Sequence, residues 1–549
     1  MSVCLHCSGK VRIAHSLHTK EDEFVIERRK TVFQSLQKLN INCSEDAVPH
    51  VALLGSGGGQ RAMVGLLGSL VQLDKAGLLD CILYLSGVSG STWCMASLYQ
   101  EPDWSTKLET VKDQIIRRIS GPRVSWEDAL AKLKKYYYEK DHFSLTDVWA
   151  VMVVTEYVKE IDEGKLSDQW DQHNKDPFPI YTVIDKQCKQ CKDEEDPWFE
   201  ISPHEAGYSL TGAFVETSSF GSQFVNGSKK KPQDEMDMLY LQALCGSALA
   251  DEDEIKKFLW QKINGDAEFE DSLLPKVVKP KDPSAEKGYQ VLMDLVDMNL
   301  AVLNGKDPSD LDQSIRNTLN ELSGGKSQLI FPIEKLNLKD KEDAVHYMNE
   351  HTEDVCKNLS HWFNVLESIQ ECMVQWIWGR KYDFLQNMND EALPSTLLES
   401  EMRDYEDAGL LLNSPYFPVL RKERNTDLII SLDFSEGDPF MTVREAAEMC
   451  KKRKIPFPEV NIPSEDVKKP KDFYVFKGTN TPTVIHIPLF NVVNCGDIET
   501  LRNKYRTLQV PYSAEMITDL MEVAGKNISN NREKLLEQIG AAVRQKGHN

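Results

Sequence analysis

The sequence lacks any apolar segment long enough to cross a bilayer as a helix. Its densest apolar run, Val148 to Val154, is far shorter than the roughly 18 residues that such a span needs. Residues 1–20 contain no acidic residue and no apolar core of secretory length, so we expect no signal peptide. The terminal residues 544–549 carry no prenylation box. These absences predict a protein that is neither secreted nor held in a membrane by a span or a prenyl group.

Regular cysteine spacing is also missing. The 549 residues include 12 cysteines, and without a regular spacing these are typical of reduced thiols in a cytosolic protein. Two CxxC pairs, Cys4 with Cys7 and Cys188 with Cys191, could in principle supply four zinc ligands. The pairs are far apart in the chain, so we expect no metal site.

Positive charge is in deficit. Lysine and arginine number 64 against 86 aspartate and glutamate residues, which gives a formal net charge of −22. A surface of this charge repels phosphate backbones, which excludes nucleic acid as the main partner. It also opposes non-specific adsorption to an anionic membrane, so any membrane contact must be local and largely apolar.

What the sequence does contain is a strand-to-helix turn centred on a serine. An apolar run from Ile82 leads into residues 87–91, GVSGS, and then into a helix-compatible segment that reaches Tyr99. This order is typical of a nucleophile elbow, in which glycines permit the strained backbone that lifts a serine out of the sheet. An ordinary structural turn would show the same five-residue pattern. Ser89 is the candidate nucleophile.

A glycine-rich loop stands upstream of this turn. Residues 55–61, GSGGGQR, follow a second apolar run at 50–54 and precede an apolar helix. Consecutive glycines leave N–H groups free to converge on an anion, as in an oxyanion hole. Nucleotide binding is the rival interpretation, but Gln60 and Arg61 stand where a Walker loop needs Lys-Ser/Thr and a dinucleotide fingerprint needs a third glycine. Arg61 either donates two parallel hydrogen bonds to a phosphate or carboxylate, or is a salt-bridged surface residue.

A serine nucleophile needs a base, and the sequence offers two candidates. His486 lies in the middle of the apolar run 483–490, where a core histidine is the ordinary interpretation. Asp407 precedes an apolar stretch at 410–412, which places its carboxylate at the edge of an element, where a helix-capping role is the ordinary interpretation. The residues alone leave a Ser-Asp dyad and a Ser-His-Asp triad both open.

The remaining pattern is that of alternating strands and helices. Apolar runs predict buried strands at 50–54, 177–185, 428–434 and 483–490, and helices are predicted at 21–39, 289–304, 341–378 and 531–545. Charges and prolines dominate residues 264–288, which predicts a mobile loop or lid hinge.

Four motifs resemble those of the cytosolic phospholipase A2 family, whose catalytic domain is patatin-like. They are SGGGQRAM at 56–63, GVSGSTW at 87–93, DAGLLLNSPYFPVL at 407–420 and LIISLDFSEGDPF at 428–440. Within the family the chain is most similar to the gamma type, which lacks the N-terminal calcium-dependent docking domain, because only about fifty residues precede the glycine loop.

The resemblance implies roles for particular residues. It implies a catalytic dyad of Ser89 and Asp407 without a histidine, with Gly58 and Gly59 donating to the oxyanion. It also implies that Arg61 and Arg424 bind the substrate phosphate, and that no metal or cofactor takes part.

We therefore expect a three-layer α/β fold with a patatin-like core and a helical cap formed by inserted segments. Residues 1–20 should be a flexible tail, and residues 21–549 a single catalytic domain with a lid near 264–288. The expected reaction is calcium-independent hydrolysis of fatty acyl esters of glycerophospholipids to free fatty acid and lysophospholipid, with lysophospholipase or transacylase side activity.

The expected partners are the phospholipid substrate and a phospholipid membrane surface, with no nucleic acid. We expect a cytoplasmic protein that associates peripherally with intracellular membranes. Two alternatives from other classes are an inactive relative that binds lipid or protein without turnover, and a Ser-His-Asp esterase of soluble substrates with His486 as its base.

Overall fold

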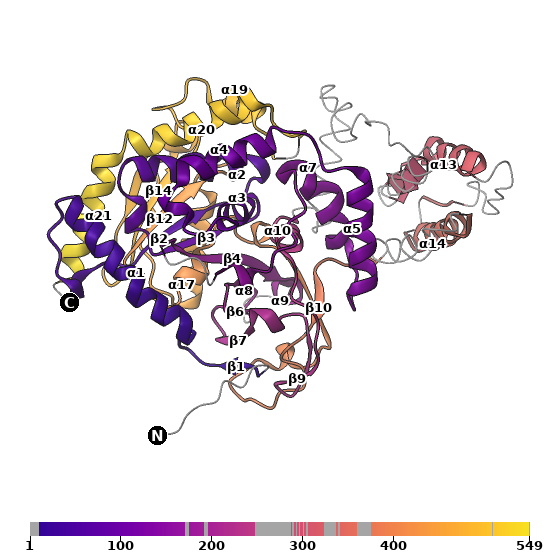
Figure 1. Cartoon of the computed structure of the whole chain (residues 1–549), viewed down its shortest axis with the longest axis horizontal. Coiled ribbons are helices and arrows are strands. Elements are labelled where there is room, and N and C mark those ends of the chain that lie inside the picture. The colour runs from indigo at the N-terminus through magenta and orange to yellow at the C-terminus, as the bar shows by residue number, and fades with distance from the viewer. Residues whose placement is uncertain are drawn as a thin grey trace. The chain divides into compact units, whose positions relative to one another are not determined.

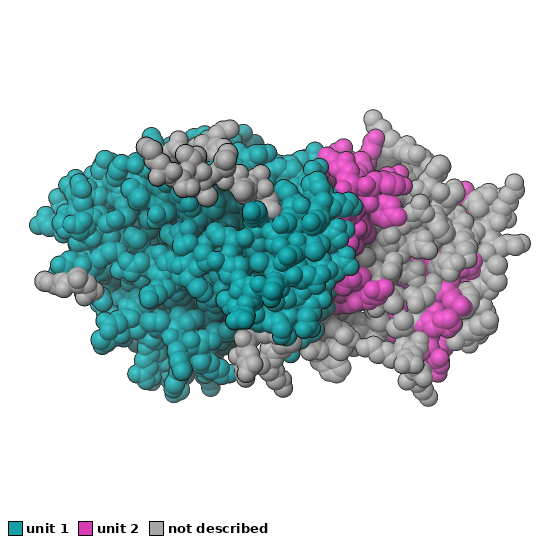
Figure 2. Space-filling model, turned by 90° about the horizontal axis from the view of Figure 1, so that it is seen from below, with its two compact units in different colours: residues 1–123, 153–251, 381–549 teal, residues 124–152, 252–380 magenta. Residues whose placement is uncertain are grey.

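The chain folds into two compact units, which Figure 2 colours separately. Unit 1 comprises Met1–Arg123, Val153–Asp251 and Lys381–Asn549, and unit 2 comprises Val124–Met152 and Glu252–Arg380. The computed structural model describes residues 10–170, 175–190, 196–247, 306–322, 341–358, 375–507 and 509–547, with scattered positions at 287–302 and 336–338.

A mixed β-sheet organises unit 1. Its strand order is β1-β7-β6-β5-β4-β3-β2-β12-β14-β13, with β11 beside β4, β10 beside β11, and a separate β8-β9 pair. Strands β4, β3, β2, β12 and β14 run parallel, and the flanking pairs are antiparallel. The strands are β1 (Arg12–Ile13), β2 (Val51–Gly55), β3 (Tyr84–Gly87), β4 (Phe178–Asp185), β5 (Trp198–Ile201), β6 (Glu205–Tyr208), β7 (Ala213–Glu216), β8 (Gln223–Val225), β9 (Ser228–Lys231), β10 (Arg380–Tyr382), β11 (Met402–Asp407), β12 (Leu428–Asp433), β13 (Tyr474–Phe476) and β14 (Thr483–Pro488).

The central parallel strands are buried along their whole length. Continuous apolar runs are what strands covered by helices on both faces require, and this is why the sequence shows runs rather than alternation there. The strands predicted at 50–54, 177–185, 428–434 and 483–490 are confirmed as β2, β4, β12 and β14.

Helices cover both faces of this sheet. On one face α2 packs against α3, α4 and α20, so that segments from opposite ends of the chain lie side by side (Figure 1). On the other face, Tyr84 Oη donates to Glu21 of α1, and Thr442 Oγ1 of α17 donates to Asp433. The three layers confirm the predicted α/β fold. The helices are α1 (Thr19–Lys38), α2 (Gly59–Lys75), α3 (Gly90–Tyr99), α4 (Leu108–Ile119), α7 (Thr155–Val158), α8 (Leu166–Gln169), α9 (Lys186–Gln190), α10 (Met238–Cys245), α16 (Tyr416–Val419), α17 (Met441–Arg453), α18 (Ser464–Lys468), α19 (Ile498–Lys504), α20 (Ala514–Ser529) and α21 (Arg532–Lys546).

The described elements that lie wholly within unit 2 are helical. They are α5 (Trp126–Glu139), α6 (Leu145–Trp149), α13 (Ser309–Leu322) and α14 (Lys341–Asn358). Helix α5 begins at a capping serine, because Oγ of Ser125 accepts the N–H of Asp128 at 3.1 Å. Residues 264–286 and 288 lie outside the described residues, so the lid stays a prediction.

The N-terminal segment is more ordered than the sequence predicts. Strand β1 pairs with β7, and the guanidinium of Arg12 forms a 2.7 Å ion pair with Glu205. Helix α1 begins at Thr19, behind a cap in which Nδ1 of His18 accepts the N–H of Lys20. Residues 10–20 therefore include a paired strand and the start of α1, whereas the sequence predicts a flexible tail through residue 20, and residues 1–9 lie outside the described residues.

The helices that the structure describes include none with both the length and the apolar character that crossing a bilayer requires.

Candidate active site

Ser89 occupies a sharp turn at the carboxyl end of β3. Strand β3 ends at Gly87, α3 begins at Gly90, and Ser89 between them has φ 51° and ψ −123°. A residue with a side chain keeps such a conformation only where the surrounding structure enforces it, as in a nucleophile elbow. The structure thus has the strand-turn-helix geometry that the sequence predicts, with Ser89 at its apex.

The glycine-rich loop runs directly against this turn. Strands β2 and β3 are parallel neighbours, so the loops after them meet at the same edge of the sheet. A methyl group on Gly90 would lie 1.8 Å from the carbonyl oxygen of Gly59, and one on Gly57 would lie 3.0 Å from Cβ of Ser89. Side chains at these positions would therefore separate the loop from the nucleophile.

Gly58 and Gly59 bring main-chain donors to this point. Their φ values are 154° and 56°, in the region that favours glycine, and α2 begins at Gly59. N–H groups in the first turn of a helix have no intrahelical acceptor, and the helix dipole adds partial positive charge there. The loop can therefore donate hydrogen bonds to an anion that forms beside the nucleophile.

Asp407 reaches the same place from another strand. Strands β3 and β11 follow one another along one edge of β4, because β5 pairs along the other edge. Gly87 lies opposite Tyr181, and Asp407 lies opposite Val183, two residues further along β4. This register places Asp407 about 7 Å beyond Gly87, the last residue of β3. Ser89 follows Gly87 by two residues, so it lies at the same end of the sheet as Asp407.

The carboxyl group of Asp407 is poised to exchange a proton near neutral pH. Burial raises its pKa to about 7, against the opposing effect of hydrogen bonding from Gly409 and Ser89. Its Oδ1 accepts the N–H of Gly409 at 2.8 Å, while Oδ2 is buried and makes no fully formed hydrogen bond to a described residue. The hydroxyl of Ser89 is therefore close enough to affect the pKa of Asp407, although its hydrogen bond to the carboxyl group is not of full geometry. Catalytic hydrogen bonds are often long or poorly aligned before substrate binds.

Arg61 is a buried anchor in this structure. Its side chain is 1% exposed, and it donates to the carbonyl oxygens of Phe434 and Tyr505 at 2.6 and 2.7 Å and to Oγ1 of Thr507 at 3.0 Å. Nη1 also lies 3.6 Å from the carboxylate of Glu436. This placement does not fit the predicted contact with a substrate phosphate, because the guanidinium is enclosed by protein acceptors.

Arg424 lies at the other end of the sheet. It precedes β12, at the amino ends of the parallel strands, whereas Ser89 follows their carboxyl ends. All five of its N–H groups donate to protein oxygens, which belong to Glu21, Glu200 and Pro418. This placement does not fit the predicted phosphate role of Arg424, because the side chain is fully buried in an ion-pair network that connects α1 to β5.

His486 is remote from the nucleophile. Strands β2 and β12 separate β14 from β3, which amounts to about 14 Å at the usual strand spacing. The ring is fully buried, its Nε2 is 2.6 Å from the carbonyl oxygen of Pro439, and burial lowers its pKa. This position does not fit the Ser-His-Asp alternative, because two strands lie between β14 and the strand that leads to Ser89.

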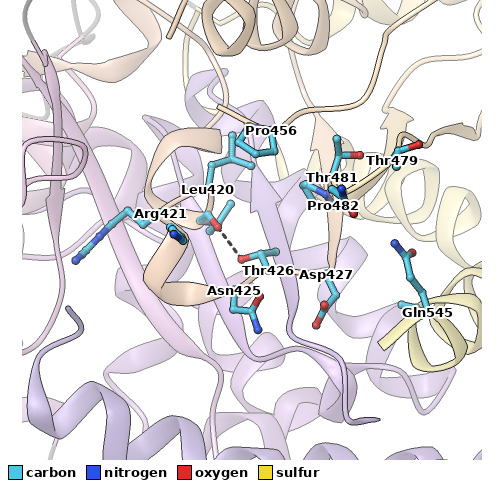
Figure 3. Close-up of a pocket in the computed structure, with 14 residues that line it drawn as sticks. Leu420, Arg421, Asn425, Thr426, Asp427, Pro456, Thr479, Thr481, Pro482 and Gln545 are labelled. Atoms are coloured by element: carbon cyan, nitrogen blue, oxygen red, sulfur yellow. Dashed lines mark hydrogen bonds between the residues drawn. The ribbon is translucent and has the colours of Figure 1, made fainter. Parts of the chain in front are cut away.

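A pocket of about 550 Å³ opens at the amino ends of the parallel strands (Figure 3). It is lined by residues 425–427, which precede β12, and by residues 479–482, which precede β14. Arg421 also lines it, but its guanidinium is directed away toward Glu200, to which it donates at 2.7 Å (Figure 3). This pocket is therefore separate from the edge that carries Ser89.

No metal site is found within the part of the chain that the structure describes, where no cluster of three or more candidate ligands occurs. Cys4, Cys7 and Cys191 of the two CxxC pairs lie outside those residues.

Sequence reasoning missed two sets of contacts to the glycine loop. Nδ2 of Asn413 donates to the carbonyl oxygen of Gly57. Arg61 donates to Tyr505 and Thr507, and the N–H of Tyr512 donates to Oε1 of Gln60 at 2.7 Å. Asn413 stands inside the motif at 407–420, but a single amide in a loop gives no signal of the partner it will have. The whole arrangement places a serine, a carboxyl group and main-chain donors together, and groups of these types can carry out acyl transfer.

Comparisons with known proteins agree with this geometry. The family model described as "Lysophospholipase catalytic domain" matches residues 51–282. The chain is 32% identical to cytosolic phospholipase A2 gamma of Mus musculus, over 97% of this chain and 93% of that protein. It is also 32% identical to cytosolic phospholipase A2 gamma of Homo sapiens, over 97% and 96%.

The fold is also similar to a solved structure, human GIVD cytosolic phospholipase A2. The TM-score is 0.69 at 22% identity, over 98% of this chain and 66% of that chain. This chain thus spans just under two thirds of the solved protein, and the likeness concerns the fold.

Proposed function

The chain belongs to the cytosolic phospholipase A2 family, and from this premise we propose that it hydrolyses fatty acyl esters of glycerophospholipids. The observation that carries the proposal is the pairing of Ser89, at the apex of the elbow, with Asp407, whose pKa burial raises to about 7. A base with a pKa near neutrality accepts a proton efficiently and can return it in the next step.

The proposed reaction begins with acylation of Ser89. Asp407 accepts the hydroxyl proton as Oγ attacks the ester carbonyl, and the N–H groups of Gly58 and Gly59 stabilise the tetrahedral oxyanion. The intermediate collapses when the leaving alcohol, a lysophospholipid, takes the proton from Asp407. Water then attacks the acyl-enzyme with Asp407 again as base, which releases the fatty acid and restores Ser89.

Further features of the activity follow from the same chemistry. The dyad needs no metal for either step, so we propose that turnover is independent of calcium. A lysophospholipid ester can replace the first substrate, and an alcohol can replace water, which gives lysophospholipase and transacylase activity. We also propose that the enzyme is cytoplasmic and reaches its substrate by peripheral association with membranes.

The experiment that tests this function uses vesicles of a phosphatidylcholine with different acyl chains at its two positions. A metal chelator should not lower the rate, because neither chemical step uses a metal. In the initial phase, before lysophospholipid accumulates as a second substrate, we expect free fatty acid and lysophospholipid in equal amounts. Mass spectrometry of the products measures both species and shows which ester is cleaved. Folded protein that binds the vesicles but releases no fatty acid would instead favour the inactive lipid-binding alternative.

Arg61 is proposed as a positioning residue for the glycine loop, in place of a phosphate ligand. Arg61→Lys should lower kcat about tenfold on a phospholipid and on a neutral carboxylic ester alike. Three different nitrogens of Arg61 reach Phe434, Tyr505 and Thr507, and the single nitrogen of lysine cannot take all three positions. Initial rates on the two substrates measure this. Thr507→Val removes one of the three bonds and is the matched control, with an expected loss below about threefold. A loss confined to the phospholipid would restore the phosphate role.

A further inference from the structure

The two halves of the proposed site come from loops that are far apart in the chain. The glycine loop follows β2, and Asp407 ends β11. Asn413 lies in the segment that leads from Asp407 to α16, and its hydrogen bonds to Gly57 connect that segment to the glycine loop.

Asn413 engages both main-chain polar groups of Gly57. The N–H of Gly57 donates to the main-chain oxygen of Asn413 at 3.1 Å, and Nδ2 of Asn413 donates to the carbonyl oxygen of Gly57 at 3.1 Å. Nδ2 also donates to Oγ of Ser435 at 3.0 Å. Both hydrogens of the amide nitrogen are thus used. The amide atom that faces the carbonyl oxygen of Gly57 must be a donor, so it is the nitrogen Nδ2 and not the oxygen Oδ1. The hydrogen bonds therefore fix the orientation of the amide.

The amide oxygen consequently lies beside the reacting groups. A methyl group on Gly57 would be 2.3 Å from Oδ1 of Asn413 and 3.0 Å from Cβ of Ser89. A methyl group on Gly409 would be 2.9 Å from the same Oδ1 and 3.0 Å from Oδ1 of Asp407. Oδ1 of Asn413 is therefore a near neighbour of both the nucleophile and the base.

We propose that Asn413 is a positioning residue that locks the oxyanion-binding loop to the segment carrying the base, so that both approach Ser89 in one fixed arrangement. The inference rests on the proposed acyl-transfer function. A shorter or apolar side chain would leave the carbonyl of Gly57 without this donor and would loosen the loop whose next residues, Gly58 and Gly59, face the oxyanion.

The test compares pH–rate profiles of kcat/KM for the wild-type protein, Asn413→Asp and Asn413→Ala on a soluble carboxylic ester. The carboxylate created by Asn413→Asp would be more exposed than Asp407, so it ionises first and raises the pKa of Asp407. We expect the acid limb of the profile to move up by about one pH unit. Asn413→Ala should lower kcat about tenfold with little change in KM, since the loop donors act mainly in the transition state.

Ser435→Ala is the matched control, because it removes the other acceptor of the amide and leaves both bonds to Gly57. It should stay within about threefold of the wild type. An acid limb that Asn413→Asp leaves in place, or a kcat of Asn413→Ala within threefold of the parent, would overturn the inference; if Asn413→Asp does not fold, Asn413→Ala decides alone. A folded wild-type protein without turnover would instead contradict the proposed function.

Discussion

Asp407→Asn should nearly abolish acylation of Ser89, whereas His486→Gln should keep most of it. Asparagine preserves the shape of the buried side chain but cannot accept a proton, so we expect a loss of about 10³-fold or more. His486 lies three strands away from the nucleophile, and its replacement should affect only packing in β14. Single-turnover acylation, measured for both variants at matched thermal stability, distinguishes Asp407 from His486 as the base. A dead His486 variant beside a substantially active Asp407 variant would reverse the assignment.

The same carboxylate should set the pH dependence of the wild-type enzyme. Burial raises the pKa of Asp407 to about 7, so below that pH the group is protonated in the folded protein and cannot serve as a base. The rate of acylation should therefore fall about tenfold for each pH unit below 7 and level off above it. In Asp407→Asn, any activity that remains should not show this fall in rate below pH 7.

Ser89→Ala should reduce turnover of every ester substrate by about 10⁴-fold or more, as the loss of a serine nucleophile generally does. Alanine removes the only atom that forms the acyl-enzyme and leaves the strand-turn-helix backbone in place. Turnover measured with the thermal unfolding midpoint distinguishes a chemical from a folding defect. Activity within tenfold of the parent would place the nucleophile elsewhere.

The central sheet and the elbow are predictable because they depend on local pattern. Buried parallel strands need continuous apolar runs, and a sharp strand-to-helix turn needs glycines beside Ser89, so both leave marks in the sequence. Local pattern alone did not choose between Asp407 and His486, since each has an ordinary structural interpretation. The order of the strands around β4 supports our proposal of Asp407 as the base, and that order is a property of the fold.

For Arg61 and Arg424, the residue type alone does not predict the role of the side chain. Arg61 and Arg424 are suited to binding a phosphate, but their partners come from segments remote in the sequence. For Arg424 these partners are Glu21 and Glu200, which meet only when α1 packs against the sheet. The guanidinium groups of Arg421 and Arg424 overcome the effect of burial and lower the pKa of Glu200 to about 2, which keeps this carboxylate ionised near neutral pH. Such contacts require knowledge of the tertiary structure.

The most direct test of the Ser89–Asp407 pair is covalent labelling with an alkyl fluorophosphonate, whose phosphorus is attacked by an activated serine with loss of fluoride, followed by peptide mass spectrometry. We expect one adduct per chain on the peptide that contains Ser89, no adduct in Ser89→Ala, and strongly slowed labelling in Asp407→Asn. Folded wild-type protein that remains unlabelled, or that carries its adduct on another residue, would contradict the proposal that Ser89 and Asp407 form the catalytic pair.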